Sequence, residues 1–294
     1  TLAILRFAGN AALAVPLAET MLAGWMLGVA GIEMPAGRIA FGPTSSADRV
    51  MLRDNRLSGR IARMPFARDC NHAALLASSE DGLRIVLVEL STASLQPADN
   101  LAFEPVDRVF FENTPIVATA ATPDTFTAET TLLMGAASRS MQIAGALETM
   151  LAIATDYAGQ RRAFERPISK FQAIQHSIAQ LAGEVAVSLS AAASAAEALE
   201  TLIDGGRRFD DPELLLEVIS AKVRASSAAT KGSAIAHQLF GAIGVTREHI
   251  LHRLTLRALA WRDDYGNESH WSERLGRMVS SRGAPALWPL LATR

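Results

Sequence analysis

Three arginines crowd one short stretch of the chain. Arg161, Arg162 and Arg166 lie within YAGQRRAFERPISKFQAIQH, residues 157–176. Pro167 cannot continue a helix and disfavours helical geometry at the residue before it, so the stretch predicts a corner between two helices. Guanidinium groups beside the free N–H groups of a new helix suit a phosphate or diphosphate. Arginines at a helix end are also ordinary partners of the helix dipole, and the residues alone leave both interpretations open.

The apolar spacing on either side of this corner predicts the two helices. Before the corner, apolar residues recur at intervals of three and four: Met141, Ala144, Leu147, Met150, Leu151 and Ala154. The same spacing resumes after it at Ile168, Phe171, Ile174, Ile178 and Leu181. Arg161 is therefore predicted at the end of one long helix, and Gln172 in the first turns of the next.

Further segments with this spacing predict helices over 128–163, 168–204, 212–240, 246–262 and 268–281. Gly205-Gly206 separates the second helix from the third, and Asp211-Pro212 opens the third, because glycine ends helices and Asp before Pro begins them. Long antiparallel helices with short links predict a four-helix bundle plus a C-terminal extra over residues 125–294.

Residues 32–124 predict a β domain. Glycine, proline and aspartate punctuate short apolar runs at 38–41, 72–77, 83–90 and 108–111. The run from 83 to 90 follows a turn at Glu80-Asp81-Gly82 and is the strongest strand candidate. Several strands at this spacing indicate a small barrel or sandwich. Because residues 1–31 are rich in Ala and Leu and predict one or two helices, the expected class is α+β, with an N-terminal helical remnant, a middle β domain and a C-terminal bundle.

Composition and charge argue against several classes of protein. The 294 residues are 49% hydrophobic and 20% charged, which is typical of a globular protein. A net charge of -2 without basic, aromatic-rich stretches argues against nucleic-acid binding. The longest apolar run, Met21 to Ile32, is too short for a membrane span. The single cysteine, Cys70, fits a reducing, cytoplasmic location. The six histidines show no HExxH or comparable ligand pair; His249 and His252 could share a helix face, but such a pair is more commonly just exposed, so no metal is expected.

The order of residues at the corner resembles the acyl-CoA dehydrogenase family. Its third domain has a Y…R..FG.PI..FQ corner, matched here by Tyr157, Arg161, Phe164, Pro167-Ile168 and Phe171-Gln172. A second stretch, AHQLFGAIG at 236–244, resembles the family's Q-[IL]-x-G-G-x-G segment. The family's T-E-P…G-S-D segment has only a poor counterpart in FGPTSS, 41–46. Family members usually carry a longer N-terminal helical domain, of which 1–31 would be a truncated remnant.

The resemblance implies FAD as the cofactor, bound at a boundary between subunits. Arg161 and Gln172 match residues that reach the diphosphate of FAD held mainly by the neighbouring subunit, and Phe164 matches an aromatic residue beside the flavin. Further family positions fall on Ile168, Gln238, Gly241 and Gly244. The backbone of the last segment approaches the adenosine half of FAD in the family, although a helix end followed by a turn would also explain its glycines. Glu165 and Ala242 depart from the family, since each replaces a glycine.

The resemblance also implies α,β-dehydrogenation of an acyl-CoA thioester, which needs a carboxylate aimed at the α-carbon. Many relatives place a glutamate directly after a tyrosine, and the matching pair here is Tyr265-Gly266. A second family location for the base falls at about Gly135. Both positions lack a carboxylate. The local alternatives are Asp263, Asp264 and Glu268, of which Glu268 would equally suit the first turn of a helix.

Two main hypotheses about function follow. The chain is either an acyl-CoA dehydrogenase-like flavoprotein, or a catalytically deficient partner subunit of a hetero-oligomeric acyl-CoA dehydrogenase, since the usual base position is Gly266. The pattern of tryptophan, tyrosine, glycine and histidine in residues 261–271 resembles that of family branches in which two related chains assemble. A helical scaffold without a small-molecule site is the third reading. The resemblance implies an acyl-CoA substrate, a homo-oligomer (dimer or tetramer) or a hetero-oligomer with a paralogue, and an electron-transfer flavoprotein as redox partner.

Overall fold

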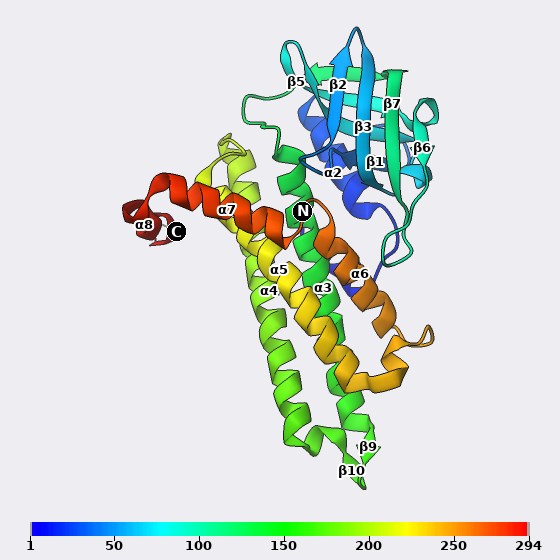
Figure 1. Ribbon diagram of the computed structural model, residues 1–294, viewed down its shortest axis with the longest axis vertical. Coiled ribbons are helices and arrows are strands. Elements are labelled where there is room, and N and C mark those ends of the chain that lie inside the picture. Colours follow the sequence, from blue (N-terminus) through cyan, green and yellow to red (C-terminus); the bar gives the residue numbers. More distant parts are fainter. Residues whose placement is uncertain (1, 293–294) are drawn as a thin grey trace.

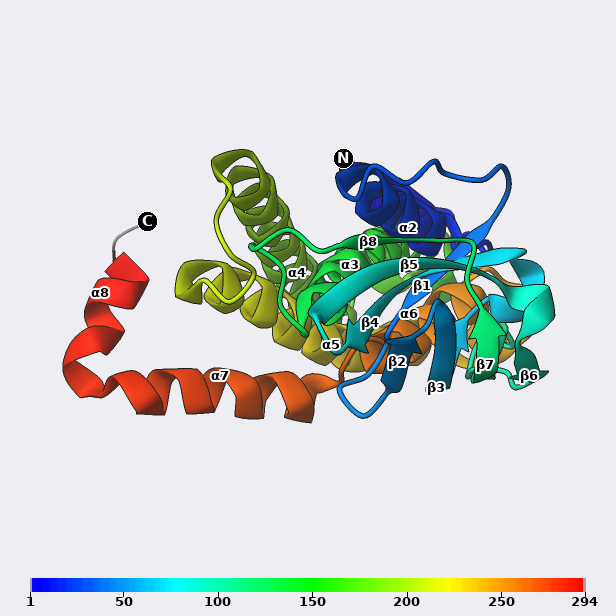
Figure 2. The same ribbon diagram turned by 90° about the horizontal axis from the view of Figure 1, so that it is seen from above.

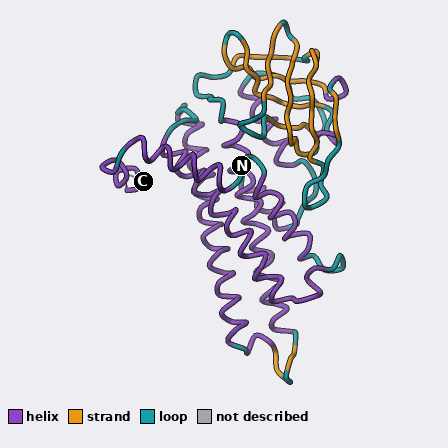
Figure 3. The backbone as a smooth tube through the Cα atoms, viewed as in Figure 1, coloured by secondary structure: helices purple, strands orange, loops and turns teal. Residues whose placement is uncertain are grey.

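The computed structural model describes residues 2–292 and places a sheet domain at one end of a long helical bundle (Figures 1 and 3). Two N-terminal helices, α1 (Ala3–Asn10) and α2 (Leu17–Val29), join the two parts. Helix α1 packs along the bundle helix α3, while α2 packs on the sheet. The predicted α+β class, with N-terminal helices, a β middle domain and a C-terminal helical domain, is confirmed.

Eight strands form one sheet in the order β6-β7-β3-β2-β4-β5-β8, and β1 pairs parallel to β4. Their bounds are β1 Ile39–Gly42, β2 Arg49–Arg53, β3 Arg56–Pro65, β4 His72–Ser79, β5 Gly82–Glu89, β6 Ser94–Gln96, β7 Val106–Pro115 and β8 Ala118–Ala121. The strongest predicted strand, 83–90, is β5, which pairs antiparallel with β4 along its whole length. The predicted run 38–41 overlaps β1, and the runs 72–77 and 108–111 fall within β4 and β7.

Strands β1, β4 and β5 are buried on both faces, which explains why they are apolar at nearly every position, whereas β2 and β3 expose alternate residues. Along β5, Val86 and Val88 belong to a core enclosed within the sheet domain. The alternate residues Ile85 and Leu87 belong to the main core, shared with α2 and the bundle. This alternation follows from the two-residue period of a strand. The sheet domain is therefore packed onto the bundle rather than linked to it flexibly.

The C-terminal part is built from long helices: α3 (Thr130–Gln160), α4 (Gln172–Gly205), α5 (Pro212–Phe240) and α6 (Leu251–Asp263). Helix α5 begins as predicted, because the Asp211 carboxylate accepts the N–H groups of Glu213 and Leu214 at its first turn. Two predicted helix starts are wrong. Helix α4 begins at Gln172 instead of 168, and α6 begins at Leu251 instead of 246, since turns occupy the intervening residues.

Helix α7 (Glu268–Arg282) and the short α8 (Leu287–Ala292) reach away from the sheet domain (Figure 2). By length and composition, α4 could cross a membrane, contrary to what the longest apolar run predicts. Its alanine-rich sequence satisfies that criterion while it packs between α3 and α5, and a bundle helix of a globular protein passes the same test. Helix α4 therefore gives only weak evidence for a membrane span.

Candidate functional site

The corner between α3 and α4 is a β-hairpin at the tip of the bundle, farthest from the sheet domain (Figures 1 and 3). Strands β9 (Arg162–Ala163) and β10 (Arg166–Pro167) pair antiparallel across a two-residue turn. Both turn residues have left-handed backbones, Phe164 with φ 51° and Glu165 with φ 64°. Such turns match the twist of paired strands but favour glycine or asparagine. The Glu165 position is the one at which the family has glycine.

The polar side chains of this hairpin point to solvent. Arg161 and Gln172 are exposed, and within the described part of the chain the Arg161 guanidinium has no hydrogen-bond or ion-pair partner. Arg162 donates to the carbonyl oxygen of Glu165, and the Arg166 guanidinium carbon lies 4.2 Å from the centre of the Phe171 ring. The backbone N–H of Ile168 donates to the Arg161 carbonyl at 2.8 Å, which closes the base of the hairpin.

Phe164 is 90% exposed at the hairpin tip, where its ring meets the edge of Phe171 at 6.2 Å. An aromatic side chain this exposed contributes little packing energy to the fold of its own chain. It is available to a neighbouring molecule, together with the guanidinium of Arg161.

The second predicted segment lies at the same end of the bundle. The ring of Tyr157, in the last turns of α3, stacks on Phe240, the final residue of α5, with centroids 4.5 Å apart. Gln238 and Gly241 are exposed there. Gly241 has φ 65°, and nothing lies within 4 Å of the position a β-carbon would take. The chain therefore brings Arg161, Gln172, Gln238 and Gly241 to one end of the bundle.

Gly244 has a packing role of its own. A β-carbon there would lie 2.9 Å from Leu251 and from Phe240, so the residue must be small for α6 to turn back against α5. Gly244 is buried, which places it beneath the exposed surface rather than on it.

These residues fit the diphosphate that the resemblance implies. An unpaired guanidinium, two exposed amides and an open glycine backbone supply hydrogen-bond donors and room for an anion. All four residues are exposed to solvent, so a ligand held here would remain accessible to a second molecule.

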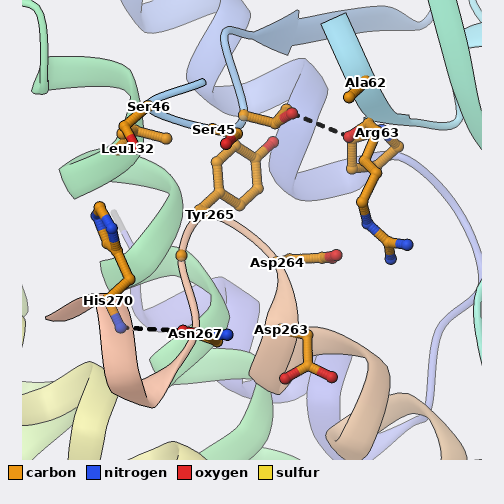
Figure 4. A pocket seen from close by; sticks show the side chains of 13 residues that line it. Ser45, Ser46, Ala62, Arg63, Leu132, Asp263, Asp264, Tyr265, Asn267 and His270 are labelled. Atoms are coloured by element: carbon orange, nitrogen blue, oxygen red, sulfur yellow. Dashed lines mark hydrogen bonds between the residues drawn. The ribbon is translucent and has the colours of Figure 1, made fainter. Parts of the chain in front are cut away.

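A second candidate site is a cavity of about 250 Å³ between the sheet domain and the α6–α7 connection (Figure 4). Ser45 and Arg63 lie on its sheet side, while Tyr265 and His270 lie on the helical side. The Tyr265 hydroxyl and His270 Nε2 are buried and have no hydrogen-bond partner within residues 2–292. The cavity is the place where the family's catalytic glutamate is expected, because Gly266 lines it.

Gly266 cannot carry a larger side chain in this conformation. It has φ 90°, and a β-carbon would lie 2.6 Å from Trp271 Nε1 and 2.8 Å from the His270 ring. Trp271 is fully buried, and its indole N–H donates to the Tyr265 carbonyl at 2.9 Å. The expected base position is therefore closed by packing as well as lacking a carboxylate.

The alternative base position, Gly135 on α3, is closed by a different residue. The Tyr265 ring lies directly against it, so that a β-carbon at 135 would be 2.2 Å from ring carbons. Tyr265 is 2% exposed, and burial raises the pKa of its hydroxyl well above the ordinary value. A phenol that holds its proton more tightly is not a general base.

Asp264 is committed to a buried ion network. The Arg139 guanidinium, 2% exposed, donates to Asp264 at 3.1 Å, to Gln142 at 2.6 Å and to Glu19 on α2. Burial disfavours the charge of Arg139, but Glu19 and Asp264 outweigh it and raise the pKa of the guanidinium. Burial likewise raises the pKa of Glu19, against the pull of Arg139. The network joins α2 and α3 to the residue before Tyr265.

The two other carboxylates near Gly266 are poorly placed for catalysis. Glu268 is exposed in the first turn of α7 and does not line the cavity. Asp263 does line the cavity, but the Arg262 guanidinium donates to both of its carboxylate oxygens at 3.1 Å.

The sequence analysis missed Lys222, Arg139 and Glu19. Lys222 is fully buried in α5, and its ammonium donates to the Trp261 and Arg262 carbonyls at 2.7 and 2.9 Å, at the end of α6. Burial lowers the pKa of Lys222 to about 7. The available signal was a charged residue on a largely apolar helix face, as at Arg139 between the buried Ala136 and Ile143.

Comparison with known proteins relates the helical C-terminal part of the chain to one family. The family model described as "Acyl-CoA dehydrogenase, C-terminal domain" matches residues 126–267. Acyl-CoA dehydrogenase IpdE2 of Mycobacterium tuberculosis is 31% identical over 135 residues, which are 46% of this chain and 37% of that protein. The matched region thus spans little more than a third of this curated relative.

Solved structures show the same fold over nearly the whole chain. The steroid acyl-CoA dehydrogenase variant Tcur3481-Tcur3483 superposes with a TM-score of 0.81 at 20% identity, over 95% of this chain and 80% of that one. The ChsE4-ChsE5 complex of Mycobacterium tuberculosis gives 0.78 at 21% identity, over 96% and 80%. The electron transferring flavoprotein structure from Acidaminococcus fermentans gives 0.73 at 20% identity, over 93% and 80%. The structural neighbours thus include hetero-oligomeric complexes.

Proposed function

The chain belongs to the acyl-CoA dehydrogenase family, and on that premise we propose that it is the cofactor-completing subunit of a two-chain acyl-CoA dehydrogenase. In this proposal the partner chain supplies the catalytic base. The assembly removes the α-proton and the β-hydride of an acyl-CoA thioester, and FAD, when bound, accepts the hydride. An electron-transfer flavoprotein is the proposed acceptor of the electrons.

The observation that carries the proposal is the closure of both base positions. The Tyr265 ring fills the space over Gly135, and Trp271 with His270 fills the space beside Gly266. Loss of a general base typically costs about 10²–10⁴ in rate. A chain in which packing excludes a carboxylate from both positions is therefore better suited to supporting a partner's site than to catalysis alone.

At the bundle tip, the residues of this chain would hold the diphosphate of FAD lodged in the partner. Arg161 would donate charge-assisted hydrogen bonds to diphosphate oxygens, with the Gln172 amide beside it. Gln238 and the Gly241 backbone would approach the adenosine half. Phe164, exposed at the hairpin tip, would exclude water from the cofactor's edge.

The comparisons support a two-chain assembly. Two of the structural neighbours carry paired chain names, and one of them is described as a complex. An acyl-CoA substrate and a cytoplasmic location remain part of the proposal.

Co-expression with a family paralogue tests the proposal. The chain purified alone and supplied with FAD should show no acyl-CoA-dependent reduction of an acceptor dye, while the co-purified pair should show it. Dehydrogenation by the isolated chain would contradict the partner-subunit role. In an active pair, replacing the partner's base should abolish activity, whereas Asp263→Asn in this chain should leave it within about twofold.

A further inference from the structure

A groove of about 510 Å³ lies between α6, the α1–α2 connection and the loop between β6 and β7. It is lined by the apolar residues Ala12, Leu13 and Leu256 and by three exposed residues that we call its rim, Phe103, Arg247 and Arg253. None of the residues predicted to bind FAD or to act as a base lines it. Cavities of roughly 300–1,000 Å³ are the usual size of small-molecule sites.

Phe103 reaches this groove from a loop that is held by internal hydrogen bonds. Its side chain is 74% exposed, and its backbone has φ 60°, in the left-handed region. The Asn100 side-chain oxygen accepts the N–H groups of Ala102 and Glu104, at 2.8 and 3.1 Å, while the Phe103 N–H donates to the Asn100 carbonyl. An exposed aromatic ring on a backbone this constrained is pre-organised for stacking.

The loop is fixed to α6 by a buried ion pair. Arg257 donates to Glu104 at 2.6 Å, and both side chains are almost fully buried. This pair neutralises Glu104, the acidic residue nearest to Phe103 in the loop. The remaining charge at the groove is therefore cationic.

Two guanidinium groups at the rim have no hydrogen-bond or ion-pair partner in the described residues. They belong to Arg247 and Arg253, which are both exposed. His252, which also lines the groove, engages the His249 carbonyl through Nδ1 at 2.6 Å. The groove therefore offers two free anion-binding groups next to an aromatic ring and apolar lining residues.

From this arrangement we propose that the groove binds the adenosine diphosphate moiety of a nucleotide or of a nucleotide-containing coenzyme. The adenine would stack on Phe103 beside the apolar lining residues, and the phosphates would lie on Arg247 and Arg253. Inorganic phosphate alone would not use the aromatic ring, and a purely apolar ligand would not use the arginines. The inference is independent of cofactor binding at the bundle tip.

Titration calorimetry of the whole chain with ADP, and separately with FAD, coenzyme A and pyrophosphate, tests the inference and distinguishes the sources of the moiety. Arg247→Ala and Arg253→Ala should each weaken ADP binding about tenfold. Phe103→Ala should weaken ADP about tenfold while leaving pyrophosphate unchanged. The control Arg282→Ala, at the far end of α7, should change nothing.

Absence of ADP binding at millimolar concentrations, or ADP binding that all three groove variants leave unchanged, would overturn the inference. Loss of ADP binding in Phe103→Ala together with equal loss of pyrophosphate binding would also count against stacking. Arg161→Ala separates this groove from the bundle tip. If Arg161→Ala removes FAD while the groove variants have no effect on any ligand, the groove inference fails and the proposed function stands.

Discussion

Glu165 has a backbone conformation that disfavours its side chain. With φ 64° in the hairpin turn, it lies where a β-carbon costs about 1–2 kcal/mol relative to the right-handed region. It also adds a negative charge to a segment that carries Arg161, Arg162 and Arg166.

Glu165→Gly should therefore raise the free energy of unfolding by about 0.5–1 kcal/mol, since relief of strain outweighs the extra entropy of the unfolded chain. Urea denaturation measures the change. The matched control, Ala173→Gly within α4, should instead lower stability by about 1 kcal/mol. A destabilised Glu165→Gly variant would show that the side chain makes a stabilising contact that outweighs the strain.

Lys222 makes stability depend on pH. Burial lowers its pKa from 10.5 to about 7, so between these values the unfolded chain binds more protons than the folded chain. The contribution of Lys222 to the free energy of unfolding therefore rises with pH across this window and is flat below about pH 7.

Between roughly pH 7 and 9, Lys222→Met should remove about 2 kcal/mol from the rise of the free energy of unfolding with pH. The variant also leaves two carbonyls of α6 without their donor. Chemical denaturation at several pH values provides the measurement. The exposed Lys170 serves as control, because Lys170→Met should keep the original slope. Parallel profiles for Lys222→Met and the wild-type chain would contradict a depressed pKa.

Between elements, Tyr265 and Gly135 form an interlocking contact that joins α3 to the α6–α7 connection. The ring occupies the space that a side chain at 135 would need. Because overpacking a well-ordered core typically costs about 1–3 kcal/mol, Gly135→Ala should destabilise the protein by that amount.

The double variant Gly135→Ala with Tyr265→Leu should be more stable than the sum of the single effects, since the smaller side chain relieves the clash. A thermodynamic cycle from urea unfolding of the four proteins gives the coupling. Strict additivity would mean that the two residues do not share this space.

The ion network around Arg139 joins α2, α3 and the α6–α7 connection. Arg139→Met should lower the free energy of unfolding by about 3–5 kcal/mol, because Glu19 and Asp264 would stay buried without their cation. Glu19→Gln in the Arg139→Met background should recover part of the loss. A loss below about 1 kcal/mol in the single variant, measured by denaturation, would show that water reaches the two carboxylates.

Across the whole molecule, the elements were more predictable from the sequence than the site. Helix α5 starts where Asp211 and Pro212 indicate, and β5 follows its apolar run, because these signals are local. The start of α4 was not predictable, since the hairpin before it depends on pairing between β9 and β10. The packing of the Tyr265 ring against Gly135 could not be predicted either, because this contact joins segments far apart in the chain. The role of Arg161 and Gln172 toward FAD stays a prediction.

The most direct test of the account is the flavin content of the native assembly. The tagged chain would be purified together with its partner, and flavin absorbance per complex would be compared between the wild-type chain and Arg161→Ala, with native mass spectrometry to confirm that both complexes are intact. The account predicts bound flavin with the wild-type chain and at least a tenfold loss of flavin affinity with Arg161→Ala. Unchanged flavin in the variant, or an intact wild-type assembly that takes up no flavin even when FAD is added, would contradict it.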